Sequence, residues 1–149
     1  MPMRKKHIEN CATIAAAAPD PWREADFSTE ELHHAWVALQ EGKVAGFVVF
    51  RLDADKSAEL AMIAVEPARR GRGLGSALLT YGLEQLVRAG AKRCLLEVRV
   101  SNKTAVALYN RLGFSVLARR PGLYSHPPED GLLMEKIFAQ AILTPDKAD

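Results

Sequence analysis

The apolar positions of this 149-residue chain follow two spacings, one typical of strands and one typical of helices. Val44 to Leu52 (VAGFVVFRL) is rich in β-branched and aromatic residues, and so is the stretch AELAMIAVEP that ends at Pro67. The DADKSA loop between them is too short for a crossover connection. We therefore expect these two strands to form an antiparallel pair.

Helical spacing begins after this pair. Apolar residues recur at helical intervals from Leu74 to Ala89, and Gly90 stands where a glycine commonly ends a helix. Arg93 to Val100 (RCLLEVRV) then predicts a strand. Its apolar content is typical of a parallel strand with both faces covered.

The last third of the chain repeats this order. Ser101-Asn102 is expected to cap a helix from Lys103 to Leu112, and Gly113 is expected to stop it. FSVLARR predicts the next strand and GLLMEKIFA the last one. The loop between these two strands contains Tyr124, His126, Pro127 and Pro128.

The first third reads as helical. Glu9 to Ala18 is alanine-rich and predicts a short helix that the PDPW sequence closes. A second helix is expected to begin near Phe27, with Ser28 or Thr29 as its cap, and to run to about Leu39. Because so little chain precedes the first helix, any N-terminal strand must be short.

Taken together, the order is helices, an antiparallel pair, and then strand–helix–strand–helix–strand–strand. This order predicts an α/β protein with a mixed sheet and a right-handed crossover at its centre. We expect a single domain over residues 1–138 and a frayed tail over residues 139–149.

Composition narrows the classes of function. The net charge of +2 does not support a protein that coats nucleic acid with its whole surface. The basic N-terminus is not followed by an apolar segment of a signal peptide, and no apolar run is long enough to cross a bilayer. The two cysteines form no C-x-x-C pair and the four histidines are scattered. We expect a cytoplasmic protein with reduced, buried cysteines, no metal site and no membrane partner.

The stretch RRGRGLGSALL, residues 69–79, lies between a predicted strand and a predicted helix. Backbone N–H groups at a helix N-terminus are unpaired and carry partial positive charge, and glycines allow an anion to approach them closely. Arg70 and Arg72 add charge at the rim. The stretch is therefore suited to a phosphate or pyrophosphate.

Two nucleotide-binding loops are excluded here. A Walker A loop needs a lysine after its glycines, and none follows. A dinucleotide fingerprint needs G-x-G-x-x-G, whereas Gly71, Gly73 and Gly75 are spaced G-x-G-x-G. A bare turn without a ligand and a local RNA contact through the arginines remain as alternatives.

Arg70-x-x-Gly73-x-Gly75 resembles the [Q/R]-x-x-G-x-[G/A] motif of the GCN5-related N-acetyltransferase (GNAT) superfamily. Downstream, LLEVRVSNKTAVALYNRLGF (Leu95 to Phe114) resembles the L-E-V-R-x-S-N-x-x-A-x-x-L-Y-x-x-L-G-F segment of RimI-type enzymes, which acetylate the N-terminal alanine of a small-subunit ribosomal protein. Upstream, PWRE resembles their P-W-[ST]-E, with Arg23 in place of the hydroxyl residue. The resemblance extends over most of the chain.

This resemblance implies the GNAT fold, in which two parallel strands of the central mixed sheet splay apart beside flanking helices. It also implies acetyl-CoA as the co-substrate. Ile63, Ala64 and Val65 would offer backbone groups to the pantetheine arm. The residues implied for the pyrophosphate end and its rim are Arg70, Gly71, Arg72, Gly73, Leu74, Gly75 and Ser76, and Asn102 would also touch the cofactor.

Two residues are candidates for proton transfer. Glu97 is the only acid in its apolar strand, and alternation places it on one face with Leu95 and Arg99. It could accept a proton from an amine, and the resemblance implies that role. The alternative is a Glu97–Arg99 or a Glu–Lys pair that only solvates the face of the sheet. Tyr109 shares a helical stripe with apolar residues, which is typical of a core position, but the resemblance places the general acid there.

The resemblance favours direct attack by a protein or peptide N-terminal amine within a ternary complex, with the Val65 N–H facing the oxyanion. Gly46, Tyr124, Trp22 and the loop at residues 125–130 are candidates for shaping the acceptor site. A small-molecule amine (an amino acid, polyamine or aminoglycoside) is the alternative acceptor, and a non-catalytic acyl-CoA-binding module is a third interpretation. We expect a monomer or a homodimer without a nucleic-acid partner.

Overall fold

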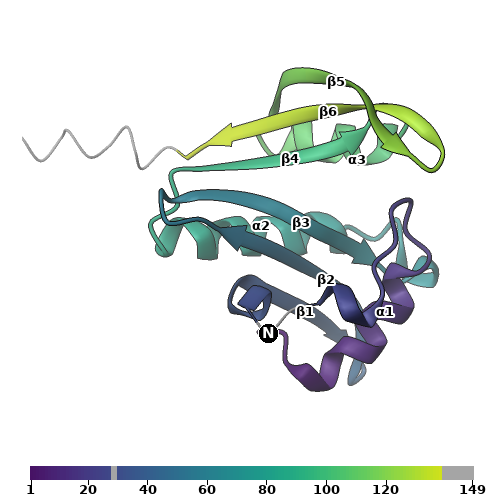
Figure 1. Cartoon of the computed structure of the whole chain (residues 1–149). Helices are drawn as coiled ribbons and strands as arrows, with labels where there is room; N and C mark the ends of the chain where they lie inside the picture. Colours follow the sequence, from purple (N-terminus) through teal and green to yellow (C-terminus); the bar gives the residue numbers. More distant parts are fainter. Residues whose placement is uncertain (28–29, 139–149) are drawn as a thin grey trace, which may run out of the picture. The chain divides into compact units, whose positions relative to one another are not determined.

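The computed structural model describes residues 1–27 and 30–138. Figure 1 shows the helices and strands that these residues form. The short 3-10 turns are η1 (Lys5–His7), η2 (Glu24–Asp26), η3 (Glu30–His34) and η4 (Pro67–Arg69). The α-helices are α1 (Ile8–Ala15), α2 (Leu74–Arg88) and α3 (Lys103–Arg111), and the strands are β1 (Ala35–Gln40), β2 (Lys43–Leu52), β3 (Ser57–Val65), β4 (Arg93–Arg99), β5 (Ser115–Ser125) and β6 (Pro128–Ile137).

The strands form one six-stranded mixed sheet in the order β1-β2-β3-β4-β6-β5. β1 pairs antiparallel with β2, and β6 pairs antiparallel with both β4 and β5. β3 and β4 are parallel, and their ladder joins Ser57, Ala58 and Glu59 to Arg93, Cys94 and Leu95. The predicted mixed α/β sheet with a parallel crossover is therefore confirmed.

Contacts divide the chain into two compact units. The first, unit 1, comprises Met1–Arg51 and Leu60–Leu86; the second, unit 2, comprises Leu52–Glu59 and the chain from Val87 on. The two units are described separately below.

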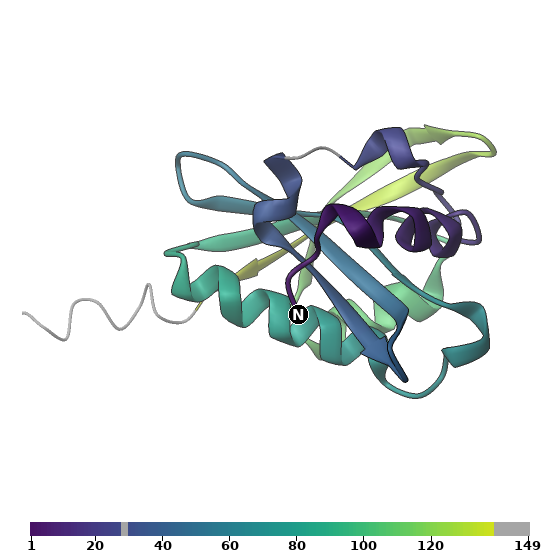
Figure 2. The same ribbon diagram turned by 90° about the horizontal axis from the view of Figure 1, so that it is seen from below.

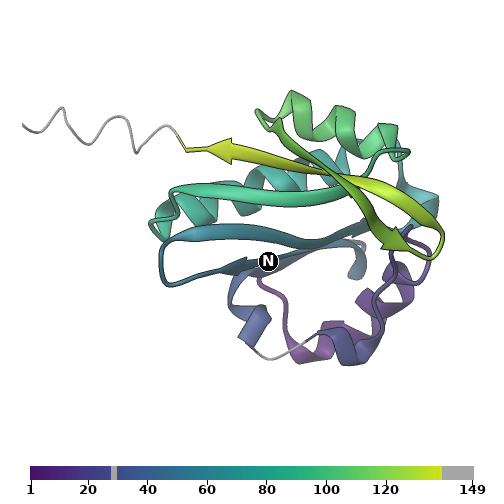
Figure 3. The same cartoon turned by 45° about the horizontal axis from the view of Figure 1, so that its top comes forward.

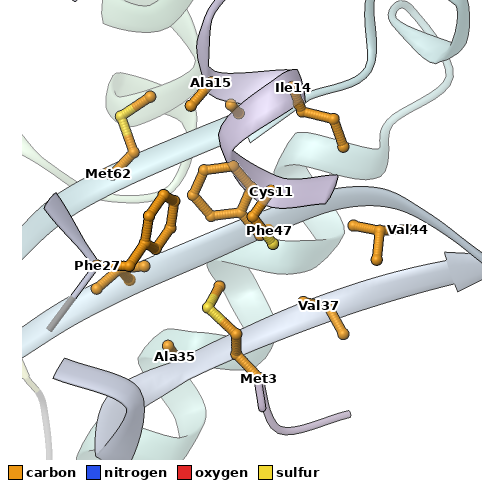
Figure 4. Close-up of a cluster of buried hydrophobic side chains, with 12 residues drawn as sticks. Met3, Cys11, Ile14, Ala15, Phe27, Ala35, Val37, Val44, Phe47 and Met62 are labelled. Atoms are coloured by element: carbon orange, nitrogen blue, oxygen red, sulfur yellow. The ribbon is translucent and has the colours of Figure 1, made fainter. Parts of the chain in front are cut away.

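Unit 1 buries apolar side chains on both faces of its strands. Phe47 and Val49 of β2 pack in a cluster with Cys11 and Ile14 of α1 (Figure 4). The next residue along β2, Phe50, faces the other way, because side chains alternate along a strand, and its ring lies against Gly82 of α2. Helices α1 and α2 therefore cover opposite faces of these strands, and the two helices can be followed in Figure 2.

The predicted helix over residues 28–39 is wrong at its C-terminal end. Residues 35–40 form β1, and the proposed caps Ser28 and Thr29 lie outside the described residues. Glu41 and Gly42 both have positive φ, 53° and 77°, which is the backbone of a tight hairpin turn whose twist matches paired strands. Pairing with β2 therefore decides the structure of AWVALQ, and this pairing is not visible in helical spacing.

In unit 2, β4, β6 and β5 lie side by side and α3 runs alongside them (Figure 3). Leu96 and Val98 of β4 are buried, but Glu97 is exposed, so the prediction that both faces of this strand are covered is wrong at that position. β5 is longer than predicted and includes Tyr124, because a register shift between Arg120 and Tyr124 accommodates the Pro-Gly pair. Pro128, predicted in the loop, begins β6.

Other predicted elements are confirmed closely. The α1, β2, β3, α2, β4 and α3 segments match their expected ranges within a few residues at each end. Gly90 and Gly113 have φ of 90° and 97°, as expected of glycines that follow a helix. Within the described ranges, no helix combines the length and the apolar character needed to cross a membrane.

Candidate functional site

The glycine–arginine loop of unit 1 turns the chain from β3 into α2. Gly71 and Gly73 have φ of 80° and 78°, a region that side chains with a Cβ rarely adopt. Open space surrounds both positions, since a Cβ built on either glycine would meet nothing within 4 Å. The glycines are therefore required by the backbone conformation, and they leave the outer side of the loop uncovered.

The first turn of α2 presents free N–H groups to this loop. The Ala77 N–H donates to the Gly73 carbonyl at 3.0 Å, so the helical hydrogen bonds start there. The N–H groups that precede Ala77, up to and including that of Ser76, make no hydrogen bond within the helix. They carry the positive end of the helix dipole. This arrangement fits a pyrophosphate, and it is what the sequence predicts for residues 70–76.

Two adjacent arginines that precede this turn hold the loop in place. Arg70 Nε donates to the Val65 carbonyl at 3.2 Å, which fastens the loop to the end of β3. Arg69, which sequence reasoning considered only as an RNA contact, donates to Gln40 Oε1 at 2.6 Å and lies 3.4 Å from a Glu66 carboxylate oxygen. Arg69 is therefore occupied within the fold.

The end of β3 alternates its side chains between two environments. Ala64 is buried with Met62 in the α1 cluster, whereas Ile63 and Val65 are half-buried on the other face. Gly46 of the neighbouring strand β2 lies so close that an added Cβ would be 3.0 Å from the Ala64 carbonyl oxygen. All the predicted cofactor residues except Asn102 thus lie in one continuous segment of unit 1.

Glu97 projects from β4 of unit 2 and remains accessible. Its carboxylate accepts a hydrogen bond from Arg120 of β5, with Nη1 3.0 Å from Oε2. About a third of the Glu97 side chain, 34%, is exposed. The alternative Glu97–Arg99 pair is wrong, because the side chain of Arg99 turns to the β5–β6 turn instead.

Tyr109 is the one tyrosine of α3, and its side chain is buried with 6% exposed. Its ring lies 5.9 Å from that of Phe114, which confirms the apolar packing expected of its stripe. Burial, with smaller contributions from Tyr124 and Cys94, raises the pKa of Tyr109 to about 12. Among residues 1–27 and 30–138 the Tyr109 hydroxyl has no hydrogen-bond partner. A phenol in this state keeps its proton at neutral pH and is available to donate it.

Asn102 caps α3 as predicted. Its Oδ1 accepts from the Ala105 N–H at 3.2 Å. The side chain is half-buried, and its predicted contact with the cofactor stays a prediction.

Sequence reasoning missed one group of side chains in unit 2. Arg99 is buried at the end of β4, stacks on Tyr124 and meets the carboxylate of Glu129. The available signal was the presence of a second charge in an apolar strand together with the acidic PED sequence. That signal does not say which acid pairs with which base, because the pairing depends on the register of β6 on β4.

Comparisons with known proteins identify the family of this chain. The sequence model described as "Acetyltransferase (GNAT) family" matches residues 5–114. The chain belongs to the GNAT acetyltransferase family. This GNAT chain is 38% identical over 113 residues to the [ribosomal protein bS18]-alanine N-acetyltransferase of Escherichia coli K12, covering 74% of each chain. It is 33% identical over 137 residues to a putative enzyme of the same name from Bacillus subtilis, covering 89% of this chain and 90% of the relative.

Solved structures extend the similarity of this GNAT chain. The crystal structure of the E. coli ribosomal-protein-S18-alanine N-acetyltransferase matches with a TM-score of 0.83 and 30% identity, over 92% of this chain and 91% of that one. Ard1 from Thermoplasma volcanium matches with a TM-score of 0.85 and 28% identity, over 92% and 95%. A putative streptothricin acetyltransferase from Bacillus anthracis, solved with acetyl coenzyme A, shares the fold at 20% identity and a TM-score of 0.64, over 70% and 61%.

Proposed function

We propose that this chain transfers an acetyl group from acetyl-CoA to the N-terminal amine of a protein, of the ribosomal-protein-alanine type. The observation that carries the proposal is the similarity to the E. coli ribosomal-protein-S18-alanine enzyme, which extends over more than nine-tenths of both chains at 30% identity. We propose that this chain acts in the cytoplasm. We propose a monomer or a homodimer that needs neither nucleic acid nor a membrane.

In this proposal the donor is held by unit 1. The free N–H groups of Gly73, Leu74, Gly75 and Ser76, with Gly71 in its left-handed conformation, hold the pyrophosphate, and Arg72 adds charge at the exposed rim. The backbone of Ile63, Ala64 and Val65 binds the pantetheine arm. Arg70 supports the loop through its hydrogen bond to Val65 rather than by its charge alone.

Proton transfer in this proposal falls to unit 2. An N-terminal ammonium has a pKa near ~8 and must lose a proton before its nitrogen can attack the thioester carbon. Glu97 accepts that proton, directly or through water. As the carbon–sulfur bond breaks, Tyr109 donates its phenolic proton to the departing sulfur, and the extra proton on the attacking nitrogen passes to the phenolate, directly or through water, so that a neutral amide and a neutral phenol remain. The Val65 N–H faces the oxyanion that forms between these steps.

In this proposal Glu97 must exchange its partner Arg120 for the ammonium group of the acceptor. Arg120 must release the carboxylate, or share it, when an acceptor ammonium arrives. Both side chains are partly exposed, 49% for Arg120 and 34% for Glu97. A surface pair of this kind contributes only about 0–1 kcal/mol, so the cost of opening it is small.

The proposal is tested by an acetylation assay on a panel of acceptors. The panel contains an alanine-starting peptide, the same peptide with its amine already acetylated, a lysine-containing blocked peptide, and free amino acids and polyamines. Acetylation of the free alanine peptide alone supports the proposal. Acetylation of small amines alone contradicts it and favours the alternative acceptor class.

Variants link this activity to the site. Glu97→Gln should lower the turnover number by about 10²-fold or more, since positioned general bases contribute about 10²–10⁴-fold. Glu84→Gln, at an exposed position on α2, is the matched control and should leave turnover unchanged. An equal loss in both variants would remove Glu97 from the mechanism.

A further inference from the structure

Arg99 is a buried cation that the proposed chemistry does not use. It is the last residue of β4, and its side chain is 6% exposed. Taking a charge out of water is costly unless other groups compensate it. The contacts that compensate Arg99 therefore indicate what this residue holds in place.

The compensating groups come from the turn between β5 and β6. Arg99 Nη2 donates to the His126 carbonyl at 3.0 Å, and Nη1 donates to the Pro127 carbonyl at 2.9 Å. The guanidinium also lies 4.3 Å from the centre of the Tyr124 ring, in the geometry of a cation–π contact. One buried side chain thus reaches three successive parts of this turn.

Glu129 connects the same turn to the start of α3. One oxygen of its carboxylate lies 3.3 Å from Arg99 Nη1, and the other accepts from the Ser101 N–H at 2.7 Å. Hydrogen bonding from Ser101, with a further contribution from Arg99, holds the pKa of Glu129 below its ordinary value. The carboxylate is therefore charged at neutral pH and can serve as the partner of the cation.

The ladder of β5 on β6 reaches this turn and pairs Ser125 with Pro128, but the side chains of the turn do not add a hydrophobic anchor. Ser125, His126, Pro127 and Pro128 are all exposed, so no apolar side chain of these four is anchored in the core. Planar guanidinium groups can bind two carbonyls and a ring at once, which an ammonium cannot do. If Arg99 only filled space in the core, the hydrogen-bond donors of its guanidinium would not be needed.

Tyr124 brings this arrangement close to the proposed acid. It is one of the groups that raise the pKa of Tyr109, so its phenol lies within electrostatic reach of Tyr109. Arg99, on which the Tyr124 ring rests, also follows the proposed base Glu97 by two residues on β4, and both side chains meet residues of β5.

We infer that Arg99 is a positioning residue for the acceptor: it fixes Tyr124 and the turn at residues 125–128 as a wall against which the first residues of the acceptor bind. This inference rests on the proposed acetylation of a protein N-terminus. Arg99 then governs the affinity for the acceptor and leaves the binding of acetyl-CoA unchanged.

Arg99→Met tests the inference, with Arg93→Met as the matched control. Arg93 is at the other end of β4 and also pairs with a glutamate of β6, Glu135, at 2.9 Å, but it is 41% exposed. Arg99→Met should raise KM for the alanine peptide by about tenfold or more, because misplacing a positioning group by ~1 Å can cost ~10²-fold. The Kd of acetyl-CoA should change by less than about twofold, and Arg93→Met should change neither constant.

A double variant separates positioning from general damage. If Arg99 acts through Tyr124, then Tyr124→Leu should raise KM, and the pair Arg99→Met/Tyr124→Leu should raise it little further. Arg99→Lys keeps the positive charge but loses the planar guanidinium with its several donors. Its KM for the alanine peptide should lie between those of the wild type and Arg99→Met. Additive effects in the double variant, or a parallel loss of acetyl-CoA affinity in Arg99→Met, would overturn the inference.

Hydrogen exchange makes the result independent of the acceptor and of the stability of Arg99→Met. The amides of Ser101, Ser125 and His126, and those of residues 129 and 130, should exchange faster in Glu129→Gln and in Arg99→Lys, while those of α3 beyond its first turn should not. Unchanged exchange in the turn would overturn the positioning role even if the peptide is acetylated. If the turn exchanges faster in these variants but the enzyme acetylates only small amines, the proposed function is contradicted, and so is the role of the turn as a wall for a peptide. The anchoring of the turn by Arg99 would still be supported.

Discussion

Replacing Tyr109 by phenylalanine should separate catalysis from stability. The variant keeps the ring that packs 5.9 Å from Phe114 and removes only the hydroxyl. Within the described part of the chain that hydroxyl is buried without a hydrogen-bond partner. A buried polar group left unpaired costs about 1–3 kcal/mol, so the free energy of unfolding should stay the same or rise by about 1 kcal/mol. For a chain of this size that rise corresponds to about 2–4 °C in Tm.

Turnover should change in the opposite direction. A positioned general acid contributes about 10²–10⁴-fold, so kcat should fall at least ~10²-fold in Tyr109→Phe. The Kd of acetyl-CoA should change by less than about twofold, because the hydroxyl acts on the sulfur only as the bond breaks. With a pKa of about 12, Tyr109 remains protonated through the neutral range, so its ionisation should not limit kcat there.

The assay follows release of the coenzyme A thiol with a thiol reagent, alongside thermal unfolding and calorimetric titration of acetyl-CoA. Cys11 and Cys94 are both buried, and burial raises the pKa of Cys11 to about 12, so the native protein should add little background. Tyr81→Phe is the control, since it also removes one phenolic hydroxyl but at a residue 43% exposed on α2. A kcat within about threefold of wild type would refute the acid role. A fall in Tm would instead show that the hydroxyl has a stabilising partner.

Further substitutions at four positions, Asn102, Gly73, Gly122 and Glu129, test the predicted contacts. Asn102→Ala should lower the free energy of unfolding by about 1 kcal/mol, because the helix cap is lost, whereas Asn102→Asp should keep the cap and the stability. If titration shows weaker binding of acetyl-CoA to Asn102→Ala, the predicted contact between Asn102 and the cofactor is supported. Gly73→Ala should cost about 1–2 kcal/mol because φ is positive, and it should weaken acetyl-CoA binding. Gly122→Ala is the control: Gly122 has a φ of 64° in β5, so the variant should lose a similar amount of stability but bind acetyl-CoA as the wild type does. Equal affinities of Gly73→Ala and Gly122→Ala for acetyl-CoA would contradict the proposal that the loop binds the pyrophosphate. The lowered pKa of Glu129 contributes stability that is present above its ordinary value of 4.5 and is lost as the pH falls through its folded-state value. Urea unfolding between about pH 3 and 6 should therefore show a shallower pH dependence in Glu129→Gln, and identical slopes would contradict this contribution.

The glycine–arginine loop and the cap at Asn102 could be predicted because their signals are local. A positive φ selects glycine at Gly71 and Gly73, and a helix start selects a side-chain acceptor such as Asn102, whatever the remainder of the chain does. The helix expected over residues 28–39 failed for the opposite reason. The AWVALQ segment has no decisive local preference, and its strand exists because β2 pairs with it.

The pairing of charges in unit 2 also depends on contacts between segments that are far apart in the sequence. The sequence places Glu97 and Arg99 two residues apart on one strand, which suggests that they meet. The ladder of β6 on β4 and the bulged pairing of β5 on β6 give them different partners: Arg120 for Glu97, and Glu129 with the turn carbonyls for Arg99.

By itself, the sequence determined the order of most elements, the glycine–arginine loop, the family resemblance and the two candidates for proton transfer. Each of these depends on spacing within a short segment, where backbone geometry and helix periodicity act directly. Only the tertiary structure decided that the Tyr109 hydroxyl is buried without a partner in the described chain and that Arg99 fastens the β5–β6 turn. Burial and long-range hydrogen bonds depend on strand register, and register is set by contacts between segments that are far apart in the chain.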